Sequence, residues 1–213
     1  MEALILVDLQ YDFMPGGALA VPKGDEVMPL ANPLASRFEL VVASQDWHPP
    51  KHRSFSSQHA GKKPGDVIDL EGIEQRLWPD HCVQNTHGAE LHHDLDRSRI
   101  ERVFQKGTDP GIDSYSAFFD NAHRRATGLG EYLKDKGVTT IYLMGLATDY
   151  CVKYSTIDAL ELGFKVSIVG DGCRGIEADL GDIEKAMREM LQRGATLTHS
   201  RRLLAEPKQA RGG

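Results

Sequence analysis

Residues 140–151 read TIYLMGLATDYC. The run Thr140–Gly145 is short, rich in large apolar residues and ended by glycine, which is typical of a strand buried on both faces of a parallel sheet. Thr148 is a favourable N-cap residue, so a helix is expected to begin there and to continue through Asp149–Leu162. Gly163 is the expected stop of that helix. A strand that passes directly into a helix is the repeating unit of α/β folds.

The same alternation of short apolar runs and helical periodicity extends in both directions along the chain. Further helices are expected at Gly128–Lys136 and Asp182–Arg193, and a less regular one, containing Pro29 and Pro33, between the first two strands. This alternation predicts an α/β fold, a three-layer α/β/α sandwich around a mostly parallel six-stranded sheet of Rossmann-like type. The other five expected strands are Ala3–Leu9, Leu40–Ser44, Arg102–Gln105, Lys165–Val169 and Thr196–Thr198.

Length and composition are those of one ordinary globular domain. The chain has 213 residues, of which 40% are hydrophobic and 26% charged. Residues 1–213 are therefore expected to form a single domain, with a long irregular insertion at about 47–80 that breaks the alternation. The basic end at residues 208–211, followed by two glycines, is interpreted as a frayed terminus.

Charge and cysteine content exclude several classes of partner. A formal net charge of −6 disfavours nucleic acid and anionic membrane surfaces. The chain has three cysteines, no basic and apolar leader, and no apolar run approaching the roughly 18 residues that a membrane helix needs. These features indicate a cytoplasmic protein with reduced thiols.

Polar side chains follow the ends of four expected strands: Asp8, then Asp46 with His48, then Lys106, then Cys151. Because the carboxyl ends of parallel strands share one rim, these groups are expected to lie close together. A helix N-terminus lowers the pKa of a thiol, so Cys151 is a candidate nucleophile. Asp8 is a candidate base for its proton, with Lys106 favouring the ionised carboxylate. A buried core cysteine, a turn aspartate and a solvated lysine are the ordinary alternatives.

A metal site is expected at the end of the second strand. Asp46 and His48 are two residues apart in an extended segment, so both side chains point to the same side. His81 is the candidate third ligand, with His52 and His59 in reserve. Two histidines and one carboxylate leave positions open for water or substrate, as in catalytic Zn²⁺ or non-haem Fe²⁺ sites. A chance cluster is the alternative, because the chain has nine histidines.

A glycine motif points to a different class of protein. Residues 170–175, GDGCRG, match G-x-G-x-x-G and follow an expected strand. A dinucleotide site needs the third glycine to open a helix, with an acidic residue on a second strand roughly 20 positions later. Residues 176–181 intervene before the next helix, and too little chain remains for the second half of such a domain. The glycines are interpreted as turn residues, and a nucleotide-binding oxidoreductase is kept as an alternative.

The candidate residues lie in short motifs spread over nearly the whole chain. The motifs are VDLQYDF at 7–13, SQDWHP at 44–49, WPDHCV at 78–83, KG at 106–107, DSYSAF at 113–118 and GLATDYCV at 145–152. Together they resemble the nicotinamidase branch of the isochorismatase-like cysteine hydrolases. The resemblance implies an amidohydrolase that converts nicotinamide to nicotinic acid and ammonia through a cysteine thioester in NAD salvage. Family members commonly accept pyrazinamide as well.

The resemblance also implies the roles of the reacting groups. Cys151 is the nucleophile, Asp8 the base and Lys106 their electrostatic partner. The bond between Leu146 and Ala147 is expected to be cis, which aims the Ala147 and Cys151 amides at the oxyanion.

A metal ion and a substrate pocket are implied as well. Asp46, His48 and His81 bind one divalent ion, with Zn²⁺ as the first candidate and Fe²⁺ or Mn²⁺ as alternatives. Ser54 falls where the family often has a further group that ligates directly or through water, and some members have histidine there. The aromatic walls around the pyridine ring are Phe13, Trp78 and Tyr115.

Two further alternatives stay open at this point. An amidase of the same superfamily that acts on a carbamoyl or ureido substrate would not need the metal. A metal-binding module without catalysis would not need Cys151. The expected partner is the small-molecule substrate nicotinamide, and a homo-oligomer is compatible with the sequence without being indicated by it.

Overall fold

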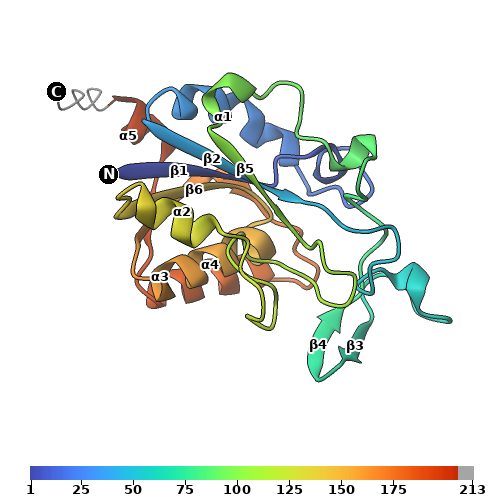
Figure 1. Ribbon diagram of the computed structural model, residues 1–213. Coiled ribbons are helices and arrows are strands. Elements are labelled where there is room, and N and C mark those ends of the chain that lie inside the picture. Colours follow the sequence, from blue (N-terminus) through green and yellow to red (C-terminus); the bar gives the residue numbers. More distant parts are fainter. Residues whose placement is uncertain (206–213) are drawn as a thin grey trace.

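The computed structural model describes residues 1–205, and the predicted frayed end lies outside the described residues. Its centre is a six-stranded sheet in the order β5-β2-β1-β6-β7-β8, with every neighbouring pair parallel (Figure 1). The predicted α/β/α sandwich is confirmed, and its sheet is parallel throughout. The strands are β1 (Glu2–Val7), β2 (Leu40–Asp46), β5 (Arg102–Lys106), β6 (Thr140–Leu146), β7 (Lys165–Arg174) and β8 (Thr196–Thr198).

Helices cover both faces of the sheet (Figure 1). In β1, Leu4 and Leu6 pack into the core beneath α1, whereas Ala3, Ile5 and Val7 pack into the core on the opposite face. Burial on both faces explains why the strand is a continuous apolar run rather than an alternating one. One layer contains α1 (Met28–Ala35) and α5 (Ser200–Ala205), and the other contains α2 (Leu129–Asp135), α3 (Lys153–Glu161) and α4 (Asp182–Gln192). Among residues 1–205, no helix is both long and apolar enough to cross a membrane.

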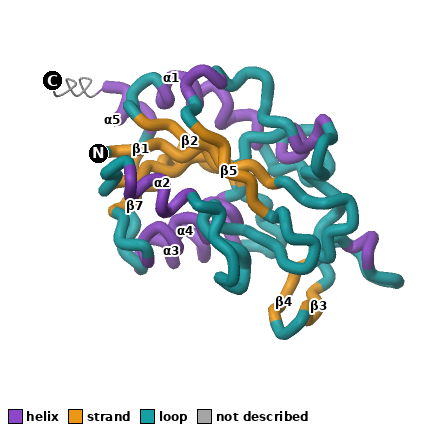
Figure 2. The backbone as a smooth tube through the Cα atoms, viewed as in Figure 1, coloured by secondary structure: helices purple, strands orange, loops and turns teal. Residues whose placement is uncertain are grey.

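The segment at residues 47–80 is less irregular than predicted. It contains an antiparallel hairpin, β3 (Val67–Leu70) and β4 (Ile73–Arg76), which forms a separate two-stranded sheet. The hairpin projects from the body of the molecule, beside the loops that gather beyond the carboxyl ends of the central strands (Figure 2). Each of its strands has only four residues, so the pattern was too short to separate from a loop.

The interpretation of residues 170–175 as a turn is wrong. β7 continues through Arg174, and its pairing with β6 shifts register between Leu143 and Gly145, which marks a bulge. A Cβ atom at Gly170 would lie 2.9 Å from the Leu197 side chain, and one at Gly172 would lie 3.1 Å from Met144 Cβ. The glycines thus allow close packing within a bulged strand. No dinucleotide-binding turn is formed there.

The segment after β6 also differs from prediction. Residues Thr148–Val152 form a π-helical turn, and α3 begins only at Lys153. Ala147 occupies the cap position without a side-chain cap bond, so the assignment of Thr148 as N-cap is wrong. The Leu146–Ala147 peptide bond is cis. Gly145 has φ +134°, and a Cβ there would lie 2.1 Å from the Val7 carbonyl oxygen, so only glycine fits.

Candidate active site

Four neighbouring strands deliver polar groups to one rim of the sheet. Asp8 follows β1, Asp46 ends β2, Lys106 ends β5, and Cys151 lies in the turn after β6. Asp46 and Lys106 are direct partners in the register of β2 and β5. All four side chains are buried, although each is charged or reactive. Parallel topology therefore gathers residues that lie as many as 143 positions apart (151 − 8) in the sequence.

Lys106 is the centre of this group. Its Nζ lies 3.0 Å from Asp8 Oδ2, 2.7 Å from Asp46 Oδ1 and 3.4 Å from Cys151 Sγ. It also donates a hydrogen bond of 2.9 Å to the Ser114 carbonyl. Burial opposes the charge, but the two carboxylates raise the pKa of Lys106 well above its ordinary value. One fixed cation therefore balances two buried carboxylates.

The two carboxylates respond differently to this environment. Burial raises the pKa of Asp8, and Lys106 offsets that rise only in part. The Ser44 hydroxyl also counteracts it, donating a 2.6 Å hydrogen bond to Asp8 Oδ1. For Asp46, burial is outweighed by Lys106 and His48, which hold its pKa well below the ordinary value. Asp46 is thus firmly ionised, whereas Asp8 is easier to protonate.

The thiol of Cys151 is not acidified in the free protein. Burial raises its pKa well above the ordinary value, and Lys106 counteracts this only in part. The prediction that the helix start lowers the pKa of the thiol is therefore wrong. The turn is buried, and the neighbouring Asp8 carboxylate also raises the pKa of Cys151. A resting thiol of this kind has to lose its proton to a base during the reaction. The Asp8 carboxylate is the neighbouring candidate acceptor, since Asp8 and Cys151 both lie against Lys106 Nζ.

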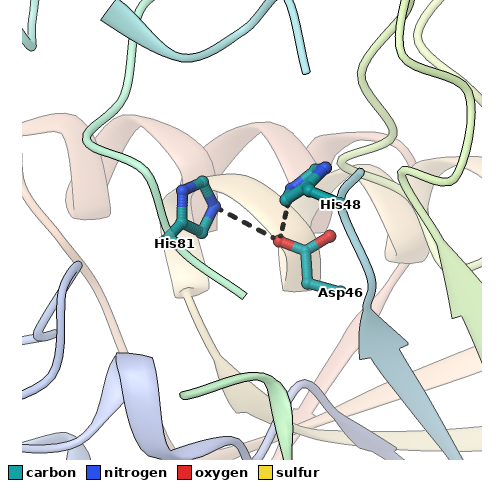
Figure 3. A group of neighbouring side chains, drawn as sticks. All are labelled: Asp46, His48 and His81. Atoms are coloured by element: carbon teal, nitrogen blue, oxygen red, sulfur yellow. Dashed lines mark ion pairs between the residues drawn. The ribbon is translucent and has the colours of Figure 1, made fainter. Parts of the chain in front are cut away.

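Asp46, His48 and His81 form a buried group beside Lys106 (Figure 3). Both imidazoles face the same carboxylate oxygen, Asp46 Oδ2, at 3.2 Å from His48 Nε2 and 3.5 Å from His81 Nε2. Ligand atoms about 2.0–2.1 Å from a tetrahedral ion lie about 3.3 Å from one another. The spacing of these three atoms fits a divalent metal ion.

The imidazole tautomers fit the same ion. His48 Nδ1 lies 3.0 Å from the Gly107 carbonyl, and His81 Nδ1 lies 2.8 Å from the Pro79 carbonyl. Because a carbonyl only accepts, each Nδ1 carries a proton, so each imidazole in its neutral form would present the lone pair of Nε2 to a bound ion. His48 Nε2 is buried and has no hydrogen-bond partner. A buried ring nitrogen that faces a carboxylate oxygen without a hydrogen bond is an arrangement that a bound cation would satisfy.

The other candidate ligands occupy different positions. Ser54 is buried, and its hydroxyl lies 2.7 Å from His52 Nδ1. His52 Nε2 in turn lies 3.2 Å from the Ile112 carbonyl, so both ring nitrogens of His52 have partners. Because Ile112 accepts from Nε2, Ser54 donates to Nδ1 and keeps its oxygen lone pairs free. His59 is partly buried, its Nε2 lies 2.7 Å from the Arg53 carbonyl, and it does not belong to the group.

The three predicted aromatic walls line one cleft above Cys151. Trp78 stands edge-on to Tyr150, and the Tyr115 hydroxyl accepts hydrogen bonds from Trp78 Nε1 at 3.3 Å and Gln75 Nε2 at 3.0 Å. The residues that line the cleft are Phe13, Leu19, Asp46, Trp78, His81, Asp113, Tyr115, Ala147, Tyr150, Cys151 and Ile176.

Several of the residues that shape the site were missed. Asp113 and Tyr150 lie inside motifs quoted above, so their position was a usable signal. Gln10 also lies in a motif: its amide donates to the Asp46 carbonyl at 2.8 Å and accepts from the Asp46 N–H at 2.8 Å. Leu19 and Ile176 come from loops without periodicity, and no pattern indicated them.

Residues 2–202 match the isochorismatase domain. The chain belongs to the isochorismatase family. Within that family it is 53% identical over 200 residues to the nicotinamidase of Escherichia coli (strain K12), covering 92% of this chain and 93% of that protein. The resemblance to the nicotinamidase branch, predicted from the motifs, is confirmed.

Solved structures of family members superimpose over almost the whole chain. The Acinetobacter baumanii nicotinamidase and pyrazinamidase has a TM-score of 0.92 at 45% identity, covering 95% of this chain and 97% of that one. The pyrazinamidase of Pyrococcus horikoshii, solved in complex with zinc, has a TM-score of 0.76 at 39% identity. That match covers 93% of this chain and 98% of the other.

Proposed function

We propose that this chain is a nicotinamidase, which hydrolyses nicotinamide to nicotinic acid and ammonia in NAD salvage and accepts pyrazinamide by the same route. The observation that carries the proposal is one buried constellation: Cys151, Lys106 and Asp8 in contact, beside a metal-ligand group and beneath aromatic walls. Identity of 53% with a nicotinamidase supports it. The chain would act as one domain, and three free cysteines favour a cytoplasmic location.

We propose that Asp46, His48 and His81 hold one divalent ion, with Zn²⁺ as the first candidate and Fe²⁺ or Mn²⁺ as alternatives. This assignment is supported by the two Nε2 atoms that face one oxygen of Asp46, and by the zinc complex of a family member. Ser54 would complete the set directly or through water. When bound, the ion supplies a Lewis acid that holds the pyridine nitrogen and orients the ring.

The reaction would proceed through the chain's own groups. Asp8 accepts the Cys151 proton as Sγ attacks the carboxamide carbon, and the Ala147 and Cys151 N–H groups hold the oxyanion. Collapse expels ammonia, which takes the proton back from Asp8, and leaves a thioester on Cys151. Asp8 then deprotonates the water that hydrolyses the thioester, which releases nicotinic acid and regenerates the thiol. Lys106 keeps its charge throughout and balances the two carboxylates. The substrate ring would lie between Phe13, Trp78 and Tyr115.

Ammonia release from nicotinamide by the purified zinc-loaded protein tests the proposal. Cys151→Ala should abolish release while zinc content stays unchanged, whereas Cys173→Ala, which removes another buried thiol, should retain it. Chelation should raise KM for nicotinamide more than it lowers kcat. Properly metallated protein that ignores nicotinamide but releases ammonia from carbamoyl amides would overturn the substrate assignment.

A further inference from the structure

Tyr115 lines two separate cavities. One is the catalytic cleft, and the other lies between α3 and the loop around residues 113–127. The second cavity is strongly acidic and polar, and none of the described residues that line it is Lys or Arg. Its polar lining includes Glu74, Ser116, Asp120, His123 and Asp158.

Asp158 is the unusual residue in this cavity. It projects from α3 and is only 4% exposed, yet its Oδ2 is buried without a hydrogen-bond partner. A buried carboxylate oxygen without a partner carries a desolvation cost that hydrogen bonds or a bound cation normally offset. Asp120, on the same wall, differs in this respect, because its Oδ1 accepts from the Ala122 and Arg124 N–H groups at 3.0 and 2.8 Å.

Two further ligand atoms lie beside Asp158. His123 Nε2 is 3.2 Å from Asp158 Oδ1, close to the spacing of about 3.3 Å between two ligands of one tetrahedral ion. Glu161 follows Asp158 by three residues on α3, so both carboxylates share one helix face. Ligand atoms of all three side chains lie within 4.8 Å of one another.

We propose that His123, Asp158 and Glu161 bind a second divalent transition-metal ion, independent of the ligand group at the catalytic cleft. One imidazole and two carboxylates form a mixed nitrogen and oxygen donor set that suits Zn²⁺, Mn²⁺ or Co²⁺. The cation would offset the charge of the buried Asp158 carboxylate, and it would connect α3 to the loop that carries Tyr115.

The number of Zn²⁺ ions bound per chain, measured by equilibrium dialysis of the full chain, tests this site. Wild type should bind two ions. Asp158→Asn and His123→Ala should each bind one while nicotinamide turnover is retained, and His87→Ala, which removes an exposed histidine elsewhere, should still bind two. Because His123 is half exposed, its replacement tests the site even if Asp158→Asn fails to fold.

A complementary variant separates the two sites. His48→Ala should also bind one ion, and the double variant His48→Ala with His123→Ala should bind none. Binding of only one ion by wild type at saturating Zn²⁺, with that ion lost in His48→Ala and kept in His123→Ala, would overturn the second site. So would retention of two ions by both Asp158→Asn and His123→Ala.

Discussion

Lys106 balances the charge of the catalytic rim, so its replacement should be costly. Lys106→Met keeps an unbranched side chain, one atom shorter, but leaves Asp8 and Asp46 as two buried carboxylates without their cation. Removing one partner of a buried pair costs about 3–5 kcal/mol. We expect a loss of that order in the free energy of unfolding, measured by urea denaturation. Lys136→Met, which breaks an exposed pair with Glu101, should have a far smaller effect, and equal losses would contradict the argument.

Ser44 should affect the pKa of Asp8, the proposed general base. Its hydroxyl donates to Asp8 Oδ1 at 2.6 Å and lowers the pKa of Asp8. A hydrogen bond to a charged group contributes about 1.5–3 kcal/mol, so Ser44→Ala should reduce kcat/KM by about 10- to 100-fold. The pKa of Asp8 should also rise, which moves the acidic limb of the kcat/KM profile to higher pH. Ser167→Ala, a buried serine in β7, is the matched control, and an unmoved limb would count against this role.

At the scale of elements, Asp171 in the bulge of β7 binds the first residue of α5 and holds that helix in place. Its Oδ1 accepts from the Ser200 N–H at 2.8 Å, and its Oδ2 accepts from the Ser200 hydroxyl. Capping contacts of this kind contribute about 0.5–2 kcal/mol, so Asp171→Ala should lose about 1 kcal/mol. Hydrogen exchange of the α5 amides should accelerate, and Asp171→Asn, which keeps one acceptor oxygen, should be milder.

The same contact makes a pH prediction. Burial opposes ionisation, but the two Ser200 bonds outweigh it and hold the pKa of Asp171 below its ordinary value. A carboxyl with a depressed pKa stabilises the fold above its unfolded pKa and loses that contribution as pH falls through the folded pKa. The stability difference between wild type and Asp171→Ala should therefore be full at neutral pH and shrink in acid. A difference independent of pH would show that another contact anchors α5.

The hairpin β3–β4 should affect substrate binding without touching the reacting atoms. Gln75 in β4 donates to the Tyr115 hydroxyl at 3.0 Å and to Asp113 Oδ2 at 3.3 Å, so it holds one wall of the cleft. Gln75→Leu should raise KM for nicotinamide by about tenfold, equivalent to roughly 1.4 kcal/mol, and leave kcat within about twofold. Glu74→Gln, at the next position of the same strand, is the control. A fall in kcat with unchanged KM would contradict a positioning role.

These elements also show what sequence alone predicts. Strands β1, β2, β6 and β7 were predicted because each contains an apolar run buried on both faces, a signal that does not depend on distant residues. The edge strands β5 and β8 are mostly exposed, so their short apolar runs gave a weaker signal. The carboxyl end of β7 and the start of α3 were not predicted. The bulge and the π-helical turn found there follow from packing against β6 and Val7, which are distant in the sequence. The hairpin was missed because its strands have only four residues each. Of its eight side chains, Gln75 is the one that bonds to a wall of the cleft, through the Tyr115 hydroxyl.

For the whole molecule, the rule that parallel strands end at one rim explains why a site was predictable at all. Asp8, Asp46, Lys106 and Cys151 follow four strands, so their proximity needed only the sheet to be parallel. The pKa of Cys151 was mispredicted because it depends on residues that are distant in the sequence. A helix start predicts the local dipole, but the dominant effect is burial by the surrounding chain, which no local pattern contains. Ile176 reaches the cleft through a loop, so only the three-dimensional structure places it there.

The proposed catalytic ion should also stabilise the whole fold, because the residues proposed to bind it join the end of β2 to the segment that carries His81. An ion that binds only the folded state at 100 times its Kd adds about 2.7 kcal/mol. For a chain of this size each kcal/mol shifts Tm by about 2–4 °C, so chelation should lower Tm by about 5–10 °C. The Tm should be measured by differential scanning calorimetry in the His123→Ala protein. That variant lacks the second site, so a change of Tm on chelation reports on Asp46, His48 and His81 alone. Adding His48→Ala to that background should remove the dependence on chelator, since it removes the buried ring nitrogen that would bind the ion. If the Tm of the His123→Ala protein were the same with and without chelator, Asp46, His48 and His81 would be an internally satisfied polar cluster, and the metal would have to be removed from the proposed reaction.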